Sequence, residues 1–480
     1  MERPLRWYDT ITINIYFLGL SALSQTMSPL IVPLLVQQFV GENLKGTYYG
    51  NLRLWSLMMA LLIQSLMGML SDHHKSKFGK RRPFMFAGTL GVILVVVLIG
   101  FAANLQGFAG YWVLFGLVIL QQIGANTGHG AVQGLIPDLV PEDKRGRFSA
   151  IKAILEVPIP VILVSLTIGK LVANGNLWTA IFVLIAILVL AMILAMFAPE
   201  KSSKDSLTSS LDWKPFMRLV SMTAVFTLVV LGLGQAIQWL QTILSGENGN
   251  QNLLIVSLIG FLAMVVAIVI GVSASTRIGI GDANAHKSSF NWWVVNRLAF
   301  LVGSTGMVSF MVYFLQGKFN YVREQAAGPA AQLTMIVGVF ILLSALPSGW
   351  LTDRFGAKKI VTISGLLAAL GAIIVIIAPS LTFVFVGGIF IGIGTGFFYS
   401  ANWALGTEIA PKNEAGRFLG ISNLAGAGAG AVGAYIGGPI ADYFTVLAPQ
   451  SPGLGYVVLF AMYGFLFLLS VACLRGVQQA

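Results

Sequence analysis

Long apolar segments separated by short polar loops run through almost the whole 480-residue chain. A bilayer core of about 30 Å requires about 20 apolar residues per helix, and the pattern contains fourteen such segments. Six precede a polar stretch at 199–216, two follow that stretch, and six more follow a second polar loop. The predicted spans are 11–39, 48–70, 84–104, 109–136, 149–173, 177–198, 219–245, 252–275, 290–316, 328–350, 360–378, 381–407, 418–443 and 454–474. The pattern therefore predicts an all-α polytopic membrane protein, with 199–216 as a flexible interdomain loop.

The composition excludes a set of soluble domains. Apolar types make up 56% of the residues and charged types only 10%, against about 25% charged in an average soluble domain. The single cysteine, Cys473, excludes a disulfide framework, and the four histidines have no metal-ligand spacing. No phosphate-binding loop, metalloprotease helix or nucleophile elbow occurs. We therefore expect no enzyme activity, no metal and no cofactor, and transport driven by ions rather than by ATP.

The net charge of +11 is explained by topology. Positive residues gather in the cytoplasmic loops of membrane proteins. With fourteen spans, 22 of the 29 Lys and Arg residues fall in loops on the side that also holds both termini, which we call the basic side. Only Lys45, Lys318 and Arg323 fall on the opposite side. We predict a multi-pass protein of the cell (inner or plasma) membrane with both termini in the cytoplasm and no nucleic-acid partner.

Two loop segments occur twice along the chain. Residues 135–151, LIPDLVPEDKRGRFSAI, align without gaps with residues 405–421, LGTEIAPKNEAGRFLGI. GMLSDHHKSKFGKRRPF, from Gly68, likewise matches GWLTDRFGAKKI, from Gly349, with four extra residues in the first copy. Parallel repeats are typical of transporters that rock around a site at the membrane midplane.

The repeats predict two six-helix halves joined by two additional helices. The N-terminal half covers 1–198, the loop and linking helices cover 199–289, and the C-terminal half covers 290–480.

The loop between spans two and three resembles the signature loop of the major facilitator superfamily. The motif consists of Gly68, Leu70, Ser71, Asp72, Gly79, Lys80, Arg81 and Arg82. The fuller string SDHHKSKFGKRRPFMFAG is similar to two branches of that superfamily, the sucrose-transporter-like group and the glycoside–pentoside–hexuronide symporters. The fourth span, with ANTGHGAVQGLIPDL, also looks like the sucrose-transporter group. The resemblance implies the major facilitator fold and transport of sugars or glycosides.

The chain departs from both branches at the positions that couple ions. The acidic residue and the arginine that the sucrose-transporter group places in span four align with Gln122 and Gln133. The paired aspartates that the glycoside group places in span two are replaced by Asn51 and Arg53. The coupling sites of these families are therefore not carried over. The two central helices are unusual for these branches but occur in certain drug exporters and bacterial peptide transporters.

Charged residues in the repeated loops are candidate gates. An acid at the end of a helix can pair with a nearby Arg or Lys and with the N-terminus of a neighbouring helix. We expect these pairs to hold the cytoplasmic helix ends together in one transport state and to separate in the other. The alternative is that they only stabilise loops and set topology. The candidates are Asp72, Arg82, Asp138, Arg147, Asp353, Glu408 and Arg417.

Ionisable residues inside membrane helices are costly and usually functional. Glu156 is predicted to lie about 12 Å into the membrane, at 1.5 Å per residue, before a helix break at Pro158 and Pro160. It shares a face with Lys152, so a simple ion pair is the alternative role. Arg53 and Arg297 are further candidates, with snorkelling and packing at a helix end as their respective alternatives.

A polar stripe runs down span four at positions Gln122, Asn126, His129 and Gln133, which share one helix face. His129 could titrate near neutral pH or serve only as a hydrogen-bonding residue. Amide groups combined with aromatic faces suit a sugar, whereas two unbalanced arginines suit an anionic substrate such as a uronide or a lipid phosphate. Further polar and aromatic candidates are Asn14, Tyr16, Gln25, Trp55, Tyr399, Asn402, Trp403 and Asn423.

The leading hypothesis is a monomeric proton-coupled symporter of a sugar or glycoside that works by alternating access. Its partners are then a small-molecule substrate, protons and the lipid bilayer. Span five lacks the glycine-rich string of exporters, which favours uptake; the related GGPIAD lies in span thirteen, where Asp442 is predicted to be a solvated helix end. One alternative is an exporter or flippase of an amphiphile, drug or lipid. Another is a non-transporting assembly or pigment-delivery factor on the same fold.

Overall fold

A computed structural model of the chain describes residues 5–202, 211–244, 249–280, 287–410, 415–451 and 453–478. Side chains at 249–250, 287, 415–420 and 423 lie outside this description. Within these ranges the structure contains helices and no strands, and fourteen helical segments are long and apolar enough to cross a membrane. Each coincides with a predicted span, so the fold class and the number of spans are confirmed.

The chain forms two compact units, which are described separately. Unit 1 comprises Met1–Leu35 and Met59–Met217, and unit 2 comprises Val36–Met58 and Arg218–Ala480. Residues 36–58 and both linking helices thus group with the C-terminal part of the chain. The predicted limits of the six-helix halves, at 198 and 290, remain a prediction about the repeat.

The first span is interrupted twice. It consists of α1 (Asp9–Thr12), α2 (Ile15–Thr26), a π-helical turn at Met27–Ile31 that includes Pro29, and α3 (Val32–Val40). Proline cannot donate a backbone hydrogen bond and so disturbs the regular helix. π-helical turns frequently occur at functional sites.

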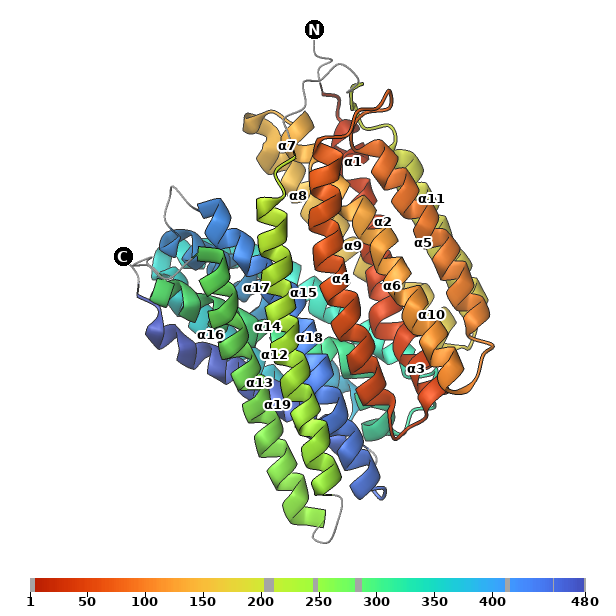
Figure 1. Cartoon of the computed structure of the whole chain (residues 1–480), viewed down its shortest axis with the longest axis vertical. Helices are drawn as coiled ribbons and strands as arrows, with labels where there is room; N and C mark the ends of the chain where they lie inside the picture. The colour runs from red at the N-terminus through yellow and green to blue at the C-terminus, as the bar shows by residue number, and fades with distance from the viewer. Residues whose placement is uncertain are drawn as a thin grey trace. The chain divides into compact units, whose positions relative to one another are not determined.

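In unit 1, α5 (Arg82–Ala102) and α6 (Gly107–Val132) pack together, and α11 (Leu177–Ala195) packs against α2 and α5 (Figure 1). Glycines permit the close approach of α5 and α6. A Cβ atom at Gly88 would lie 2.6 Å from the backbone oxygen of Gly124. After α6, the short helix α7 (Leu135–Leu139) leads into the loop before the fifth span.

The fifth span is broken where its prolines predict. It consists of α8 (Arg145–Glu156), α9 (Pro158–Leu166) and α10 (Ile168–Ala173). α9 begins with a proline in its first turn, where a missing N–H is tolerated. Glu156 is consequently the last residue of α8.

In unit 2, α17 (Leu381–Ile409) packs between α15 (Ala327–Phe355) and α16 (Ala357–Ile377). One glycine face of α17 meets α15 and another meets α16: Gly392 lies against Val337, and Gly394 lies against Ser364. Small residues on both faces of α17 therefore let its neighbours pack closely. α14 (Lys287–Phe319) packs against α18 (Ala415–Leu447) and α19 (Leu454–Cys473).

The two linking helices, α12 (Lys214–Ile243) and α13 (Gly249–Ile280), join the core of unit 2. Gln235 of α12 donates a 2.9 Å hydrogen bond to the Tyr435 hydroxyl on α18. α13 packs against both α14 and α18. The residues 214–216, predicted as the end of a loop, already belong to α12.

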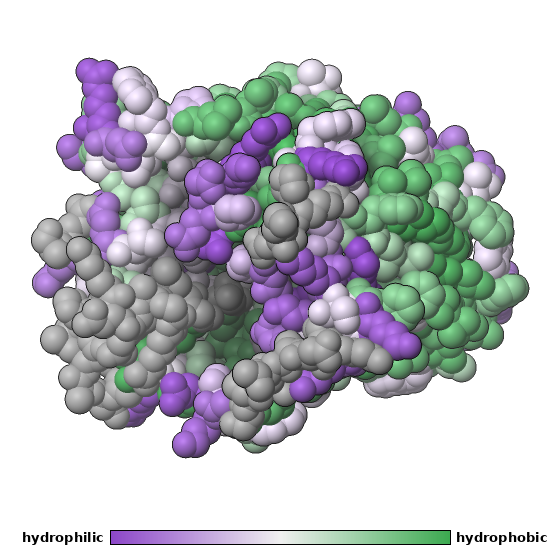
Figure 2. Space-filling view, turned by 90° about the horizontal axis from the view of Figure 1, so that it is seen from above, coloured by the Kyte–Doolittle hydropathy of each residue, from purple (hydrophilic) through white to green (hydrophobic). Residues whose placement is uncertain are grey.

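In the view from above, hydrophilic residues gather near the centre, whereas apolar residues cover the flank on the right (Figure 2). This distribution is expected for helices that end at a membrane surface. α4 (Lys45–Asp72) ends in the signature loop, whose residues form the first candidate site.

Candidate functional site

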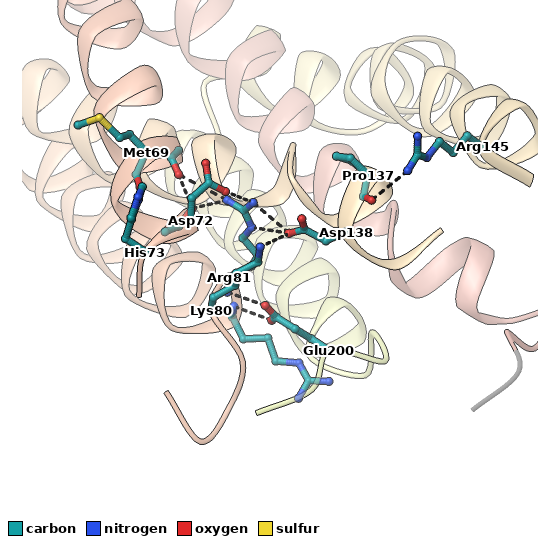
Figure 3. Close-up of polar contacts among 12 residues, drawn as sticks. Met69, Asp72, His73, Lys80, Arg81, Pro137, Asp138, Arg145 and Glu200 are labelled. Atoms are coloured by element: carbon teal, nitrogen blue, oxygen red, sulfur yellow. Dashed lines mark hydrogen bonds and ion pairs between the residues drawn. The ribbon is translucent and has the colours of Figure 1, made fainter. Parts of the chain in front are cut away.

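Arg81 lies at the centre of a polar cluster in unit 1, which we call the loop cluster: Asp72, Lys80, Arg81, Asp138 and Glu200 (Figure 3). The Arg81 side chain is only 5% exposed and forms ion pairs with Asp72 and Asp138. Its Nε donates to Asp138 over 3.0 Å, and Lys80 pairs with the same carboxylate at 3.1 Å. The planar guanidinium can bond several acceptors at once. The cluster thus joins the end of α4, the loop before α5, and α7.

Glu200 completes the loop cluster from the other side. Its carboxylate accepts hydrogen bonds from the backbone N–H groups of Arg81, at 2.7 Å, and Arg82, at 3.1 Å. Burial raises the pKa of Glu200, and the two N–H bonds and the Arg82 charge offset only part of that shift. The turn depends on Gly79, whose φ of +97° is unfavourable for other residues.

The predicted gate residues divide into two groups in unit 1. Asp72 and Asp138 each pair with a basic residue, but that residue is Arg81, which was not among the candidates; the Arg82 side chain instead donates to the Ala198 carbonyl. Arg147 is exposed and, in the part of the chain that the structure describes, makes no ion pair. Its neighbour Arg145 donates to the Pro137 carbonyl at 3.3 Å. Gating by any of these residues remains a prediction.

The second copy of the loop, in unit 2, shows fewer ion pairs than the first among the residues that the structure describes. Asp353 and Glu408 are exposed, and the Arg417 side chain lies outside the described residues. Gly356 has a φ of +89°, close to that of Gly79. Lys358, which aligns with Arg81, donates to the Val477 carbonyl at 2.7 Å. The two copies therefore share their turn but differ in their charge network.

Three of the predicted intramembrane groups form one array in unit 1. Lys152 pairs with Glu156 at 3.7 Å, and both side chains are about one-third exposed (28% and 34%). The Lys152 ammonium also lies 4.4 Å from the centre of the Phe17 ring, which contacts the His129 ring edge to face. Gln133 reaches His129 at 3.4 Å. We call this set the α6–α8 array.

Two other polar candidates in unit 1 use their side-chain amides for hydrogen bonds within the protein. Asn126 donates to the backbone and side-chain oxygens of Gln122, one turn earlier. Asn14 is fully buried and donates to the carbonyls of Thr10, at 2.9 Å, and Phe148, at 3.1 Å. Asn14 therefore fastens the start of α2 to α8.

Arg297 in unit 2 is held by amide groups rather than by an acid. Its guanidinium donates to Asn402 Oδ1 at 2.9 Å, and Asn402 in turn donates to Asn296 at 2.8 Å. The rings of Trp293 and Trp403 lie 5.9 and 5.8 Å from the guanidinium carbon. The sequence candidates Arg297 and Trp403 are therefore neighbours. Arg53, on α4, is half-buried beside Gly430 of α18.

The prediction that Asp442 is a solvated helix end is wrong. Asp442 is only 4% exposed and accepts hydrogen bonds from the backbone N–H groups of Gly46, at 2.9 Å, and Thr47, at 2.7 Å. These N–H groups begin α4 and have no acceptor within their own helix. Asp442 thus caps α4, a role that the sequence hides because the partners lie 395 residues apart.

Lys45, beside this cap, is buried and belongs to a second polar network in unit 2. It pairs with Glu42 at 2.6 Å and donates to Gln316 of α14 at 3.1 Å. Burial raises the pKa of Glu42, but the Lys45 charge and hydrogen bonds from Lys45 and Gln37 lower it by more, so the carboxyl is more acidic than usual. We call Gln37, Glu42, Lys45, Gln316 and Asp442 the α4 cap network. Among the described residues, no three His, Cys, Asp or Glu side chains could together hold a metal.

Comparison with known proteins identifies the family. A profile of the Major Facilitator Superfamily matches residues 16–322 and 298–478. A minor myo-inositol transporter of Bacillus subtilis is 31% identical over 184 residues, which cover 38% of this chain and 39% of that protein. An inositol transporter and a sucrose transport protein of Arabidopsis thaliana are each 28% identical, over 30% and 26% of this chain and 27% and 26% of their own lengths. The chain thus matches about a quarter to two-fifths of these relatives.

Solved structures agree in fold over nearly the whole chain. A nucleoside transporter aligns with a TM-score of 0.62 at 13% identity, covering 97% of this chain and 99% of that one. A peptide transporter aligns with a TM-score of 0.61 at 14% identity, covering 96% and 93%. With the profile covering both repeats, fourteen spans and this fold, the chain belongs to the Major Facilitator Superfamily.

Proposed function

We propose that the protein is a secondary active transporter that takes up a sugar or polyol together with protons by alternating access. It resides in the inner or plasma membrane as a monomer, with both termini in the cytoplasm. Its repeats form two six-helix halves, and α12 and α13 are additions. The observation that carries the proposal is the α6–α8 array, which places a carboxylate, an ammonium and an imidazole together within membrane spans.

Glu156 is the proton carrier in this proposal. An acid inside the membrane is energetically costly and usually marks a functional site. Within the described ranges, the only ion pair of Glu156 is with Lys152, at 3.7 Å. A separation of this size gives a weak pair that can open when the carboxyl accepts a proton. Because Glu156 is the last residue of α8, next to a proline break, a change in its charge can alter how α8 meets α9.

The α4 cap network supports alternating access. It fastens the junction of α3 and α4 to α14 and α18 on the side opposite the basic side. Close backbone contacts between α4 and α18 extend this connection: Gly46 meets Gly438, and Gly50 meets Ala434. Close contact between α4, α14 and α18 on one side of the membrane corresponds to one of the two states that an alternating transporter visits.

The substrate class comes from the relatives. Their names specify myo-inositol, inositol and sucrose, all rich in hydroxyl groups. The ring of Trp403, in unit 2, is the kind of aromatic group that binds the face of a sugar.

The test is uptake into proteoliposomes of the purified full-length chain. With the lumen alkaline, we expect myo-inositol, sucrose or a related solute to accumulate above its external concentration. A protonophore should reduce accumulation to equilibration. Accumulation that survives collapse of the proton gradient would contradict proton coupling. A failure of every tested polyol and sugar to enter would contradict the substrate class.

Export of an amphiphile is the second candidate. A class H tetracycline resistance protein of Pasteurella multocida is 30% identical over 118 residues, covering 25% of this chain and 26% of that protein. Everted vesicles distinguish the two functions. Proton-driven accumulation of a lipophilic drug, without movement of polyols, would replace the uptake proposal.

A further inference from the structure

α18 contains the residue types that weaken a helix. Pro439 lies inside it, and because proline has no backbone N–H, the carbonyl of Tyr435, four residues earlier, has no regular helical donor. Sharp bends in helices occur mostly at proline, and glycine lowers the stability of a helix. Glycines precede this proline at positions 426, 428, 430, 433, 437 and 438. α18 therefore bends more easily at Pro439 than an ordinary membrane helix.

α4 contacts α18 on both sides of this proline. Before the proline, Gly50 of α4 lies against the carbonyl group of Ala434. After it, Asp442 accepts the backbone N–H groups that begin α4. A bend at Pro439 would move Asp442 relative to Ala434 and away from these donors. The cap on α4 therefore depends on the path that α18 takes across Pro439.

α12 holds α18 at the residue that follows each of these contacts. Gln235 donates a 2.9 Å hydrogen bond to the Tyr435 hydroxyl, and the Tyr435 ring covers Gly234, where a Cβ atom would overlap it. The Tyr443 hydroxyl donates to the Leu244 carbonyl, just past the end of α12, at 3.1 Å. Both tyrosines are buried. The proline lies midway between them, so α12 is attached to α18 before and after the weak point.

α13 adds two contacts beyond the proline. Ile440 of α18 packs over Gly260 of α13, where a side chain would overlap it. Asn252 of α13 donates to the Leu244 carbonyl at 2.7 Å, so one oxygen accepts hydrogen bonds from α13 and from Tyr443. Carbonyls at the end of a helix have no donor within that helix, which leaves this one available to both. The end of α12, the start of α13 and the last turns of α18 are thus joined at a single carbonyl.

We propose that Pro439 is a hinge in α18 and that α12 and α13 hold the segment beyond it in place through Tyr443, which positions Asp442 on the first turn of α4. The linking helices then favour the state in which α4 and α18 are in contact on the side opposite the basic side. This inference rests on the proposed function, and it gives a role to two helices that the six-helix repeat does not require. Tyr443 is a positioning residue, because it acts on the cap through the backbone of α18.

The hinge predicts a shift between the two states of the transporter. When α18 bends at Pro439, Asp442 releases α4 and the bond from Tyr443 to Leu244 breaks, so this bond exists only in the closed state. Removing a bond that is made in only one of two states shifts their populations, and one net hydrogen bond corresponds to about fivefold. External substrate binds the state that is open to the outside, so its apparent KM should fall as that state becomes more populated. Slower closure should lower kcat.

The experiment measures access to the contact between α4 and α18 in right-side-out proteoliposomes of the full chain. Cys473→Ser removes the native thiol, and Leu57→Cys is the reporter, because Leu57 of α4 lies against Gly430 of α18. We expect Tyr443→Phe to raise the rate of labelling by an impermeant maleimide, added outside, about fivefold. Pro439→Ala should lower the rate, and Tyr443→Phe should change it little in the Pro439→Ala background.

Tyr435→Phe is the matched control. It removes a hydrogen bond between the same two helices, but on the part of α18 before the hinge, so labelling should change less than about twofold. Tyr456→Phe is a second control, because that residue is 1% exposed and its hydroxyl has no partner among the described residues. In uptake of myo-inositol, Tyr443→Phe should lower KM and kcat together. A variant that is merely less stable would lose kcat alone, and gel filtration verifies that each variant folds.

Three results would overturn the inference. One is a labelling rate that Tyr443→Phe leaves unchanged, and another is an equal increase for Tyr435→Phe, which would indicate general loosening. The third is an undiminished effect of Tyr443→Phe in the Pro439→Ala background. Any of these alongside gradient-driven uptake of a polyol would leave the proposed function standing. The expected labelling pattern without uptake of any sugar or polyol would support the hinge and contradict the proposed substrate class.

Discussion

The two copies of the signature loop have similar sequences and the same turn, yet among the residues that the structure describes only the first copy forms a network of ion pairs. In unit 1, Arg81 joins Asp72 and Asp138 and is almost fully buried. In unit 2, Lys358 occupies the aligned position and donates instead to the Val477 carbonyl, while Asp353 is exposed. An ammonium is a compact point charge, whereas a guanidinium bonds several acids at defined angles. The difference between Arg81 and Lys358 at this aligned position therefore coincides with the difference between a loop held by ion pairs and a loop held by a bond to one carbonyl.

Removal of Arg81 should have the largest effect on stability. Arg81→Gln leaves two acids facing each other, and we expect a loss of about 3 kcal/mol in the free energy of unfolding. This is the low end for a broken buried pair, because Asp72 is 51% exposed and water screens it. Lys358→Gln should cost no more than about 1 kcal/mol. Unfolding in mixed micelles, monitored by circular dichroism, measures both, and equal losses would show that the loops are equivalent.

Alanine substitutions at the aligned glycines of the two loops test the turn separately from the charges. Alanine is strained at the positive φ of either Gly79 or Gly356, by about 1–2 kcal/mol. At Gly79 its Cβ would also overlap the Glu200 carboxyl group, whereas at Gly356 no atom lies within 4 Å. Gly79→Ala should therefore be less stable than Gly356→Ala by about 2 kcal/mol, the cost of displacing Glu200 from its backbone bonds. A ranking in the opposite order in the same unfolding assay would contradict this packing.

Glu200 gives the first loop a pH dependence. Because burial raises its pKa in the folded state above the ordinary 4.5, the folded chain binds more protons than the unfolded chain just above that pH. Stability should then fall as pH rises from about 4.5 through the folded pKa. Glu200→Gln should flatten this fall, and Glu142→Gln, at a side chain that is 89% exposed, should not. Melting temperatures between pH 4.5 and 7.5 provide the measurement.

The smallest effect is expected at Asp353. Because this side chain is exposed, Asp353→Asn should change the free energy of unfolding by less than about 0.5 kcal/mol. Asp72→Asn, which removes one partner of Arg81, should cost about 1 kcal/mol. If Asp353→Asn nevertheless slows transport without affecting stability, the second loop acts in gating alone.

The sequence predicts the spans well because the signal for a membrane helix is local. Each span needs only its own apolar residues, and the break at Pro158 follows from a property of proline itself. The repeats are equally visible, down to the glycine that forms each turn.

Partner identity is harder to predict. Arg81 and Arg82 are adjacent and chemically alike, and only the start of α5 at Arg82 decides which of them faces Asp72 and Asp138. Asp442 is a more severe case, since its burial depends on backbone groups of α4, far away in the sequence. The sequence predicts that Glu156 lies within the membrane and that Asp442 is solvated, yet Asp442 is the more deeply buried of the two.

The most direct test of the proposed mechanism is a comparison of two assays on Glu156→Gln in proteoliposomes. If Glu156 carries the proton, the variant should lose accumulation driven by a pH gradient but keep exchange of labelled for unlabelled substrate, which needs no net proton movement. Glu142→Gln should retain both activities. Gradient-driven accumulation by Glu156→Gln at the wild-type level would contradict the account.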